Sequence, residues 1–184
     1  DGSSPPYAPD SAPNPLNFYG RSKLDGELEV RRCLADFCIL RVPVLYGQVE
    51  YIDESPITII AREVLNKQQH FNNWAIRYPT HVADVAVVIR QMLRRKLTEA
   101  SFGGTFHWSG NEGFTRYDMA RIMAPLLGVD ASRFVPENEP GGGAPRPKDS
   151  CLECGSLQKL GIGSRTSFRE GIEWVLREWK ETSD

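Results

Sequence analysis

A tyrosine and a lysine one helical turn apart are the residues of this sequence best suited to chemistry. Tyr19 and Lys23 stand in the run P-L-N-F-Y-G-R-S-K-L-D-G-E, and at this spacing two side chains share one face of a helix, about 6 Å apart. A nearby ammonium stabilises a phenolate and lowers the pKa of tyrosine from its ordinary value of about 10. Tyr19 is therefore a candidate general acid for reducing a carbonyl, or base for the reverse reaction. An exposed tyrosine and lysine without any catalytic role would show the same spacing.

The pair needs a helix, and the sequence predicts one from about Asn17 to Ala35. Apolar residues near helical spacing alternate there with charged ones, and Asn14 or Asn17 could cap the first turn. The run F-C-I-L-R-V follows at once and has the continuous apolar character of a buried strand in a parallel sheet. A helix that leads directly into such a strand is half of an α/β unit.

Pro43 ends this predicted strand, and V-L-Y-G is expected to form a loop at its carboxyl end. In an open parallel sheet, ligands bind beyond the carboxyl ends of the strands. The backbone of Pro43, Val44 and Leu45 could therefore face a flat cofactor ring.

The rest of the chain is predicted to be mainly helical. Ser55 before Pro56 is a favoured N-terminal pairing, and Thr115 with Asp118 has the spacing of a capping box. We expect helices over 55–68, 84–97, 115–127 and 168–180, a second strand in G-T-F-H-W-S that buries Trp108, and a loop over E-N-E-P-G-G-G-A-P-R-P-K-D-S. The fold class is therefore α/β with very few strands.

Two tryptophans of the last helix could mark a partner surface. Trp174 and Trp179 are five residues apart, which places them about 140° apart around a helix axis. Both cannot share one face, so one of them could be exposed to a partner.

The composition excludes several classes of function. With 184 residues, 40% hydrophobic and 25% charged, the chain has the composition of an ordinary globular protein of about one domain. A formal net charge of −2 without a long basic run disfavours nucleic-acid binding. No run of 18 apolar residues could span a membrane, and the first residues lack the pattern of a signal peptide, which favours the cytoplasm.

The cysteines do not predict a metal site. A structural zinc site built on C-L-E-C would need a second pair of Cys or His at similar spacing, and the sequence offers none. Four reduced thiols are the expectation for a cytosolic protein: Cys33, Cys38, Cys151 and Cys154.

Five segments occur along the chain in the order P-L-N-F-Y-G-R-S-K-L-D-G-E, L-R-V-P-V-L-Y-G, R-Y-P-T-H-V-A-D-V-A, G-T-F-H-W-S-G-N-E and R-P-K-D-S-C-L-E-C. Together they resemble the extended short-chain dehydrogenase/reductase family, close to the dTDP-4-dehydrorhamnose reductases. Within it, P-T-H-V-A-D-V-A and F-H-W-S-G-N-E resemble most the regulatory beta subunits of methionine adenosyltransferase. The resemblance covers nearly the whole chain.

This resemblance implies a cofactor site. Tyr19 and Lys23 would be the catalytic pair, with Lys23 also binding the nicotinamide ribose of NADP. Pro43, Val44 and Leu45 would line the nicotinamide.

The resemblance also implies a substrate cleft. Trp74, Arg77 and Arg146 would lie there, where an aromatic ring and guanidinium groups suit a nucleotide diphosphate; a packed tryptophan and surface arginines are the alternative. V-A-D-V-A would begin a helix, with Asp84 at the positive end of its dipole rather than in acid–base catalysis with His81.

By the same resemblance, residues 1–50 are the C-terminal piece of a Rossmann-type NAD(P)-binding domain. Residues 51–184 would form a mixed, mostly helical substrate-binding subdomain, with a returning Rossmann helix and strand near 82–109. No G-x-x-G-x-x-G occurs, and Gly141–Gly143 follow no strand. The dinucleotide fingerprint and the active-site Ser or Thr would therefore precede this stretch in a longer protein. Without them, the chain should bind a dinucleotide poorly, and its strands would lack neighbours.

Two functions of different classes follow. One is an NADP-binding regulatory subunit that tunes a methionine adenosyltransferase through its catalytic subunit. The other is an NADP(H)-dependent reductase of a nucleotide-linked 4-keto sugar, in which Tyr19 donates the proton. A third, weaker possibility is an interaction module that works without its cofactor half.

Overall fold

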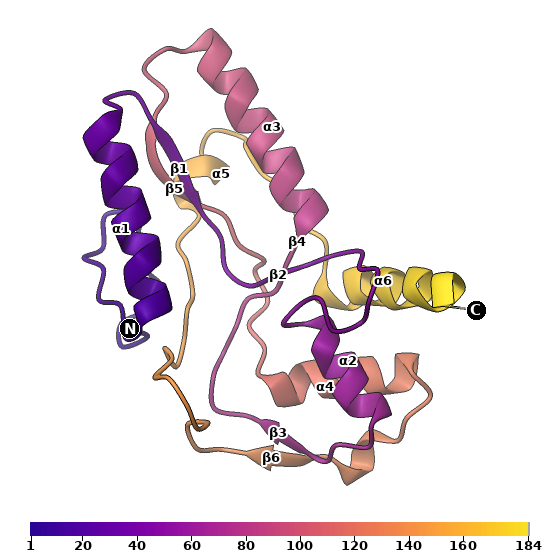
Figure 1. The fold of residues 1–184 in the computed structure, drawn as a ribbon. Coiled ribbons are helices and arrows are strands. Elements are labelled where there is room, and N and C mark those ends of the chain that lie inside the picture. Colours follow the sequence, from indigo (N-terminus) through magenta and orange to yellow (C-terminus); the bar gives the residue numbers. More distant parts are fainter. Residues whose placement is uncertain (184) are drawn as a thin grey trace.

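Short parallel strand pairs with flanking helices make up the fold of the computed structural model (Figure 1), which describes residues 1–183 and the side chains of residues 1–181. The elements are α1 (Phe18–Cys33), β1 (Cys38–Arg41), β2 (Leu45–Tyr46), α2 (Thr58–Leu65), β3 (His70–Asn72), β4 (Thr80–His81), α3 (Val82–Thr98), β5 (Gly104–His107), α4 (Arg116–Leu126), a 3-10 turn η1 (Ala131–Arg133), β6 (Val135–Glu137), α5 (Gly155–Gln158) and α6 (Phe168–Ser183).

The strands form three separate parallel pairs: β1 with β5, β2 with β4, and β3 with β6. In the first pair, Cys38 lies opposite Gly104 and Arg41 opposite His107. Parallel neighbours need a crossover connection, and here 62 residues separate the end of β1 from the start of β5. The two strands that the sequence predicts are therefore present and pair with each other. The burial expected of the first strand is wrong, because none of the four β1 residues is buried.

Two hydrophobic cores lie at opposite ends of the molecule. Figure 1 shows the β1–β5 pair between α1 and α3, and α2, α4 and α6 gathered at the other end. The core among α2, α4, α6 and β3 includes Ile60, Phe71, Met123, Phe168 and Ile172. The smaller core between α3, β5 and α5 includes Val88, Phe106, Trp108 and Leu157.

Several local predictions are confirmed. Asn17 caps α1, because its side-chain oxygen accepts a hydrogen bond from the Gly20 amide at 2.9 Å. Thr115 and Asp118 form the capping box of α4. Trp108 is buried, although it follows β5 rather than lying within it.

Other boundaries are wrong. V-L-Y-G is not only a loop, because Leu45–Tyr46 pair with Thr80–His81 as β2 and β4. The helix expected over 55–68 is shorter, Thr58–Leu65, although the Ser55 hydroxyl still accepts from the Thr58 amide at 2.9 Å. Strands of two or three residues have too little periodicity to be seen in a sequence.

The third helix also begins earlier than expected. α3 starts at Val82 rather than at residue 84, because His81 Nδ1 accepts from the Ala83 amide at 3.2 Å and caps the helix. Asp84 lies in its first turn, as predicted.

Gly171 is required where α6 crosses β2. A Cβ atom at this position would collide with the hydroxyl of Tyr46, whose side chain is 1% exposed. Because Tyr46 is held by edge contacts to His81 and Phe168, it has little room to move aside.

We therefore expect Gly171→Ala to lower the free energy of unfolding by about 1–3 kcal/mol, as overpacking does in well-packed cores. The matched control is Gly26→Ala in α1, where a Cβ meets nothing within 4 Å and helix propensity should add about 0.5–1 kcal/mol. Urea unfolding of both variants measures the difference. Equal effects would mean that Tyr46 does not pack against α6 in this way.

Candidate functional site

Tyr19 and Lys23 lie together on the first turns of α1. The Lys23 Nζ atom is 5.3 Å from the centroid of the Tyr19 ring, a distance at which an ammonium is attracted to an aromatic face. Tyr19 is 71% exposed, and Lys23 is exposed as well. The neighbourhood predicted from their spacing is confirmed, while their catalytic and cofactor-binding roles stay predictions.

The next turn of the same helix carries an ion pair that holds α1 to the sheet. Glu27 is bound by both sides of the Arg41 guanidinium, with Nε–Oε1 and Nη2–Oε2 distances of 2.7 Å. The two side chains are only 24% and 19% exposed. Bidentate, partly buried pairs of this kind are the stronger ones.

Arg41 has two further partners. Its Nη1 donates to the carbonyl of Pro9 at 3.2 Å and lies 3.4 Å from His107 Nε2. The Nδ1 atom of His107 is 3.1 Å from the carbonyl of Tyr7. This arrangement fits a neutral imidazole that donates through Nδ1 and accepts through Nε2. Burial, and then the charge of Arg41, lower the pKa of His107.

These four groups form the Arg41 node, defined by Glu27, Arg41, His107 and the 7–9 backbone. It connects α1, β1, β5 and the N-terminal segment at the carboxyl ends of the two strands. None of the residues of α1 is buried, so this node supplies much of what fixes the helix, and thereby Tyr19 and Lys23, against the sheet.

The segment Pro43–Leu45 comes just after Arg41, the arginine of the node, in the sequence. All three are half-buried. The Val44 carbonyl accepts from the Thr80 amide at 3.0 Å, and the Val44 side chain packs against the larger core. The carboxyl-end position expected for this segment is therefore observed, and its contact with a nicotinamide stays a prediction.

Arg77 lies close enough to Arg146 for the charge of one to affect the other, while their binding of a substrate stays a prediction. Arg77 Nη1 donates to the carbonyl of Ile76 at 2.7 Å. Burial, and then the nearby charge of Arg146, lower the pKa of Arg77. Like charges repel each other, and an anion near both guanidinium groups would relieve the repulsion.

The segment that carries Arg146 also reaches the start of α1. Asn17 Nδ2 donates to the carbonyl of Pro145 at 2.8 Å, and the Ile76 amide donates to the carbonyl of Lys148 at 2.7 Å. Arg146 lies between these two anchors in the sequence, so the segment that carries it runs from the start of α1 to Ile76, the residue before Arg77.

The contacts of Trp74 and His81 are those of residues that hold the fold together. Trp74 is half-buried, and its amide donates to the side chain of Asn72 at 3.2 Å; no contact joins its ring to the arginine pair within residues 1–183. Asp84 accepts from Ser164 Oγ at 2.6 Å and from the Thr166 amide at 2.7 Å. It therefore binds a loop rather than acting with His81.

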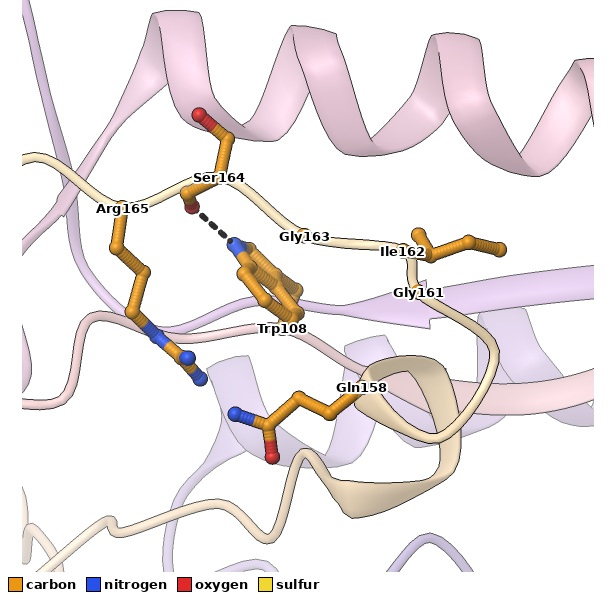
Figure 2. A pocket seen from close by; sticks show the side chains of 7 residues that line it. All are labelled: Trp108, Gln158, Gly161, Ile162, Gly163, Ser164 and Arg165. Carbon is orange, nitrogen blue, oxygen red and sulfur yellow. Dashed lines mark hydrogen bonds between the residues drawn. The ribbon is translucent and has the colours of Figure 1, made fainter.

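Neither of the two hollows found on the described chain contains the predicted site residues. The first, about 300 Å³, is lined by Trp108, Gln158 and residues 161–165. Figure 2 shows the Trp108 indole with its nitrogen bonded to the Ser164 carbonyl, at 3.0 Å. The Arg165 guanidinium lies 4.3 Å from the indole centroid, and its Nε donates to the Ser109 carbonyl. This arginine is held in place by structural contacts.

The second hollow, about 680 Å³, lies on the α4 side and is lined by both signs of charge, with Asp118, Arg121, Asp130 and Arg169 among its residues. It is remote from the β1–β5 pair in the fold, because its residues come from α4, η1 and the start of α6.

The four cysteines are free thiols. Burial raises the pKa of Cys38 and Cys154, which lowers thiol reactivity. Among the residues that the structure describes, no cluster of three metal-binding side chains occurs, and none of the helices there is long and apolar enough to cross a membrane.

The Arg41 node was missed at the level of sequence, although one signal was present. Arg41 is the single charge in the apolar run F-C-I-L-R-V. A charge within a strand of that kind requires a buried partner. Glu27 stands one turn after Lys23 on the same helix face, and could have been proposed as that partner.

Comparison with known proteins decides the family. Residues 1–181 match the family described as RmlD substrate binding domain. The chain belongs to this family. The resemblance to dTDP-4-dehydrorhamnose reductases and to the methionine adenosyltransferase beta subunit is thereby confirmed.

Beta subunits of methionine adenosyltransferase are among the curated relatives of this RmlD-type chain. The methionine adenosyltransferase 2 subunit beta of Xenopus tropicalis is 46% identical over 99% of this chain and 57% of its own length. A dTDP-4-keto-6-deoxy-D-glucose reductase of Streptomyces niveus is 32% identical over 85% of this chain and 53% of its own length. The chain thus spans little more than half of each relative.

The fold agrees. A dTDP-4-dehydrorhamnose reductase of Bacillus anthracis, solved in complex with NADP, has a TM-score of 0.79 and 26% identity over 96% of this chain and 60% of its own. The α/β fold with parallel strands, like that of Rossmann-type reductases, is confirmed.

The node predicts a stability difference between two neighbouring glutamates of α1. Glu27→Gln leaves a half-buried guanidinium without its charged partner, and we expect a loss of about 2 kcal/mol of unfolding free energy. Glu29→Gln is the control, because its pair with Arg32 is 63–73% exposed and such pairs contribute less than about 1 kcal/mol. Equal losses in urea unfolding would show that the node does not hold α1.

His107 predicts a pH dependence of stability. Its pKa is depressed in the folded chain, so the unfolded chain binds the proton more readily. The stabilisation is complete above the ordinary histidine pKa of about 6.5 and is lost as the pH falls towards the folded value. His107→Gln should flatten the decline between about pH 7.5 and 5.5. Parallel pH profiles for wild type and His107→Gln would contradict this.

Proposed function

We propose that the protein is an NADP-binding regulatory subunit that assembles with the catalytic subunit of a methionine adenosyltransferase in the cytoplasm. The observation that carries the proposal is the identity of 46% across nearly all of the chain to a methionine adenosyltransferase beta subunit. The identity to the sugar-nucleotide reductase is lower and covers less of the chain.

The residues of this chain suit the nicotinamide end of the cofactor. The Lys23 ammonium is exposed and has no carboxylate partner within residues 1–183, so it is free to bind ribose hydroxyls. Tyr19 stands beside it, and Pro43 to Leu45 follow β1 at its carboxyl end. When bound, NADPH would supply hydride. The described residues include no binding motif for the pyrophosphate of the cofactor, since no strand, glycine-rich turn and helix follow one another among them.

We further propose the domain division expected from the sequence: residues 1–50, together with the returning unit near 82–109, complete a nucleotide-binding fold, and the remainder of 51–184 is the substrate-binding part. The pairing of β1 with β5 supports it. The arginine pair, Arg77 and Arg146, and beyond it Trp74, would bind a diphosphate ligand of that part.

The second candidate is a reductase of a nucleotide-linked 4-keto sugar. It is favoured by the exposed pair of Tyr19 and Lys23 and by the two arginines, Arg77 and Arg146, whose charges affect each other. In that reaction Tyr19 Oη would donate its proton to the substrate carbonyl, and the Lys23 charge would stabilise the phenolate that remains. A regulatory subunit has no need of this proton transfer.

The test uses the complete protein that the gene encodes. We expect co-elution with the methionine adenosyltransferase catalytic subunit of the same organism, an altered rate of S-adenosylmethionine synthesis in the complex, and NADP binding by calorimetry. In a parallel assay, NADPH absorbance is followed with a dTDP-4-keto-6-deoxy sugar for wild type, Tyr19→Phe and, as control, the exposed Tyr51→Phe.

Absence of turnover together with complex formation supports the regulatory subunit. Turnover that Tyr19→Phe reduces by about a hundredfold or more, and that Tyr51→Phe retains, would replace it with the reductase. Failure to bind the catalytic subunit contradicts the first proposal even if NADP binds.

A further inference from the structure

The larger of the two hollows lies at the end of the molecule where α4 and α6 meet (Figure 1), and the proposed function leaves it unused. Its volume of about 680 Å³ falls within the range of about 300–1,000 Å³ that small-molecule sites occupy. Neither Arg77 nor Arg146, the arginines of the proposed substrate cleft, lines it. The hollow is therefore a candidate site of its own.

One wall of this hollow is apolar and is held in place from behind. Phe114, Ile122 and Val129 line the hollow and are half-buried, because they also pack against the larger core. The ring of Phe114 is in contact with that of the buried Phe168, with 5.2 Å between the ring centroids. The wall is thus formed without a ligand, and an apolar group placed on it would be removed from water.

Two arginines border the apolar wall. Arg121 comes from α4, Arg169 is the second residue of α6, and both are exposed. The Arg121 guanidinium lies 5.6 Å from the centroid of the Tyr117 ring, a contact that positions the group without using its N–H donors. Among the side chains of residues 1–181, neither guanidinium has an ion pair or a hydrogen bond. Each therefore keeps five N–H donors available for a ligand.

The two carboxylates that line the hollow are engaged in their own turns. Asp118 accepts from the amide and the hydroxyl of Thr115, at 3.0 and 2.7 Å. Asp130 accepts from the amide and the hydroxyl of Ser132, at 2.9 and 2.7 Å. Neither forms an ion pair with an arginine of the hollow in the part of the chain described. The hydrogen-bonding groups left unused are therefore the cationic ones.

We propose that this hollow binds a small organic anion, in which a phosphate or carboxylate group is joined to a compact apolar body. Arg121 and Arg169 would donate to the anionic group, since guanidinium groups bind both oxyanions through paired N–H groups. The apolar body would cover the wall of Phe114, Ile122 and Val129. The proposal is independent of the proposed function.

The test is calorimetric titration of the complete protein with naphthyl phosphate and with naphthoate. We expect at least one of the two to bind one-to-one, and its affinity names the anionic group. Inorganic phosphate supplies the anionic group alone, and naphthalenemethanol supplies the apolar body without charge. Both should bind at least about tenfold more weakly, because each makes only half of the contacts.

Substitutions locate the binding. Arg121→Gln and Arg169→Gln each remove an exposed guanidinium without a bonded partner, so the fold should be kept while the affinity falls by about tenfold or more. Arg177→Gln is the matched control, because this exposed arginine lies two turns further along α6 and does not line the hollow. Urea unfolding confirms that the variants are folded. If a glutamine variant does not fold, Arg121→Lys and Arg169→Lys keep the charge without the paired N–H groups and should still weaken binding.

Four results would overturn the proposal. They are no binding of either anion, equal binding of naphthalenemethanol, an affinity that the substitutions of Arg121 and Arg169 leave unchanged, and equal weakening by Arg177→Gln. Inorganic phosphate that binds as tightly as naphthyl phosphate would mean an adventitious ion only, and would equally contradict a site for an organic anion. The titrations contain no adenosyltransferase subunit, NADP or sugar nucleotide, so their outcome is distinguishable from that of the proposed function.

Discussion

The bidentate contact between Arg41 and Glu27 is the interaction on which the arrangement of this chain's candidate site depends. Helices usually hold their place by burying an apolar face, since packing supplies most of their stability. α1 buries no residue, and instead one guanidinium at the end of β1 binds a carboxylate of the helix and contacts β5 and the N-terminal segment. A charge placed in that strand is tolerated because each of its three nitrogens, Nε, Nη1 and Nη2, donates to an acceptor.

This polar fixing has a geometric consequence. Glu27 lies one turn beyond Lys23 on the same helix, so the node restrains the rotation of α1 and with it the direction in which Tyr19 and Lys23 point. β1 leads into the Pro43–Leu45 segment. The segment that begins at Pro145 contacts the start of α1 through Asn17. Segments 128 positions apart in the chain thus meet at the start of α1.

The two ends of the molecule differ in how complete they are. Around α2, α4 and α6 the core includes fully buried aliphatic and aromatic side chains. Around β1, the strand is half-covered and α3 leaves a leucine-rich face in water. The relatives are longer than this chain, since about two fifths of the Xenopus tropicalis protein and of the Bacillus anthracis reductase lie outside the matched part.

The sequence by itself determined the α/β class, the Tyr19–Lys23 neighbourhood, the Asn17 cap and the capping box at Thr115, because each depends on spacing within a few residues. Only the tertiary structure decided the pairing of β2 with β4 and β3 with β6, whose strands are too short for a period to show. It also decided which charged side chains lie near one another. Arg77 and Arg146 are 69 positions apart and Arg41 and His107 are 66; local pattern cannot register such distances, because chain crossovers rather than helix or strand periods bring these groups together.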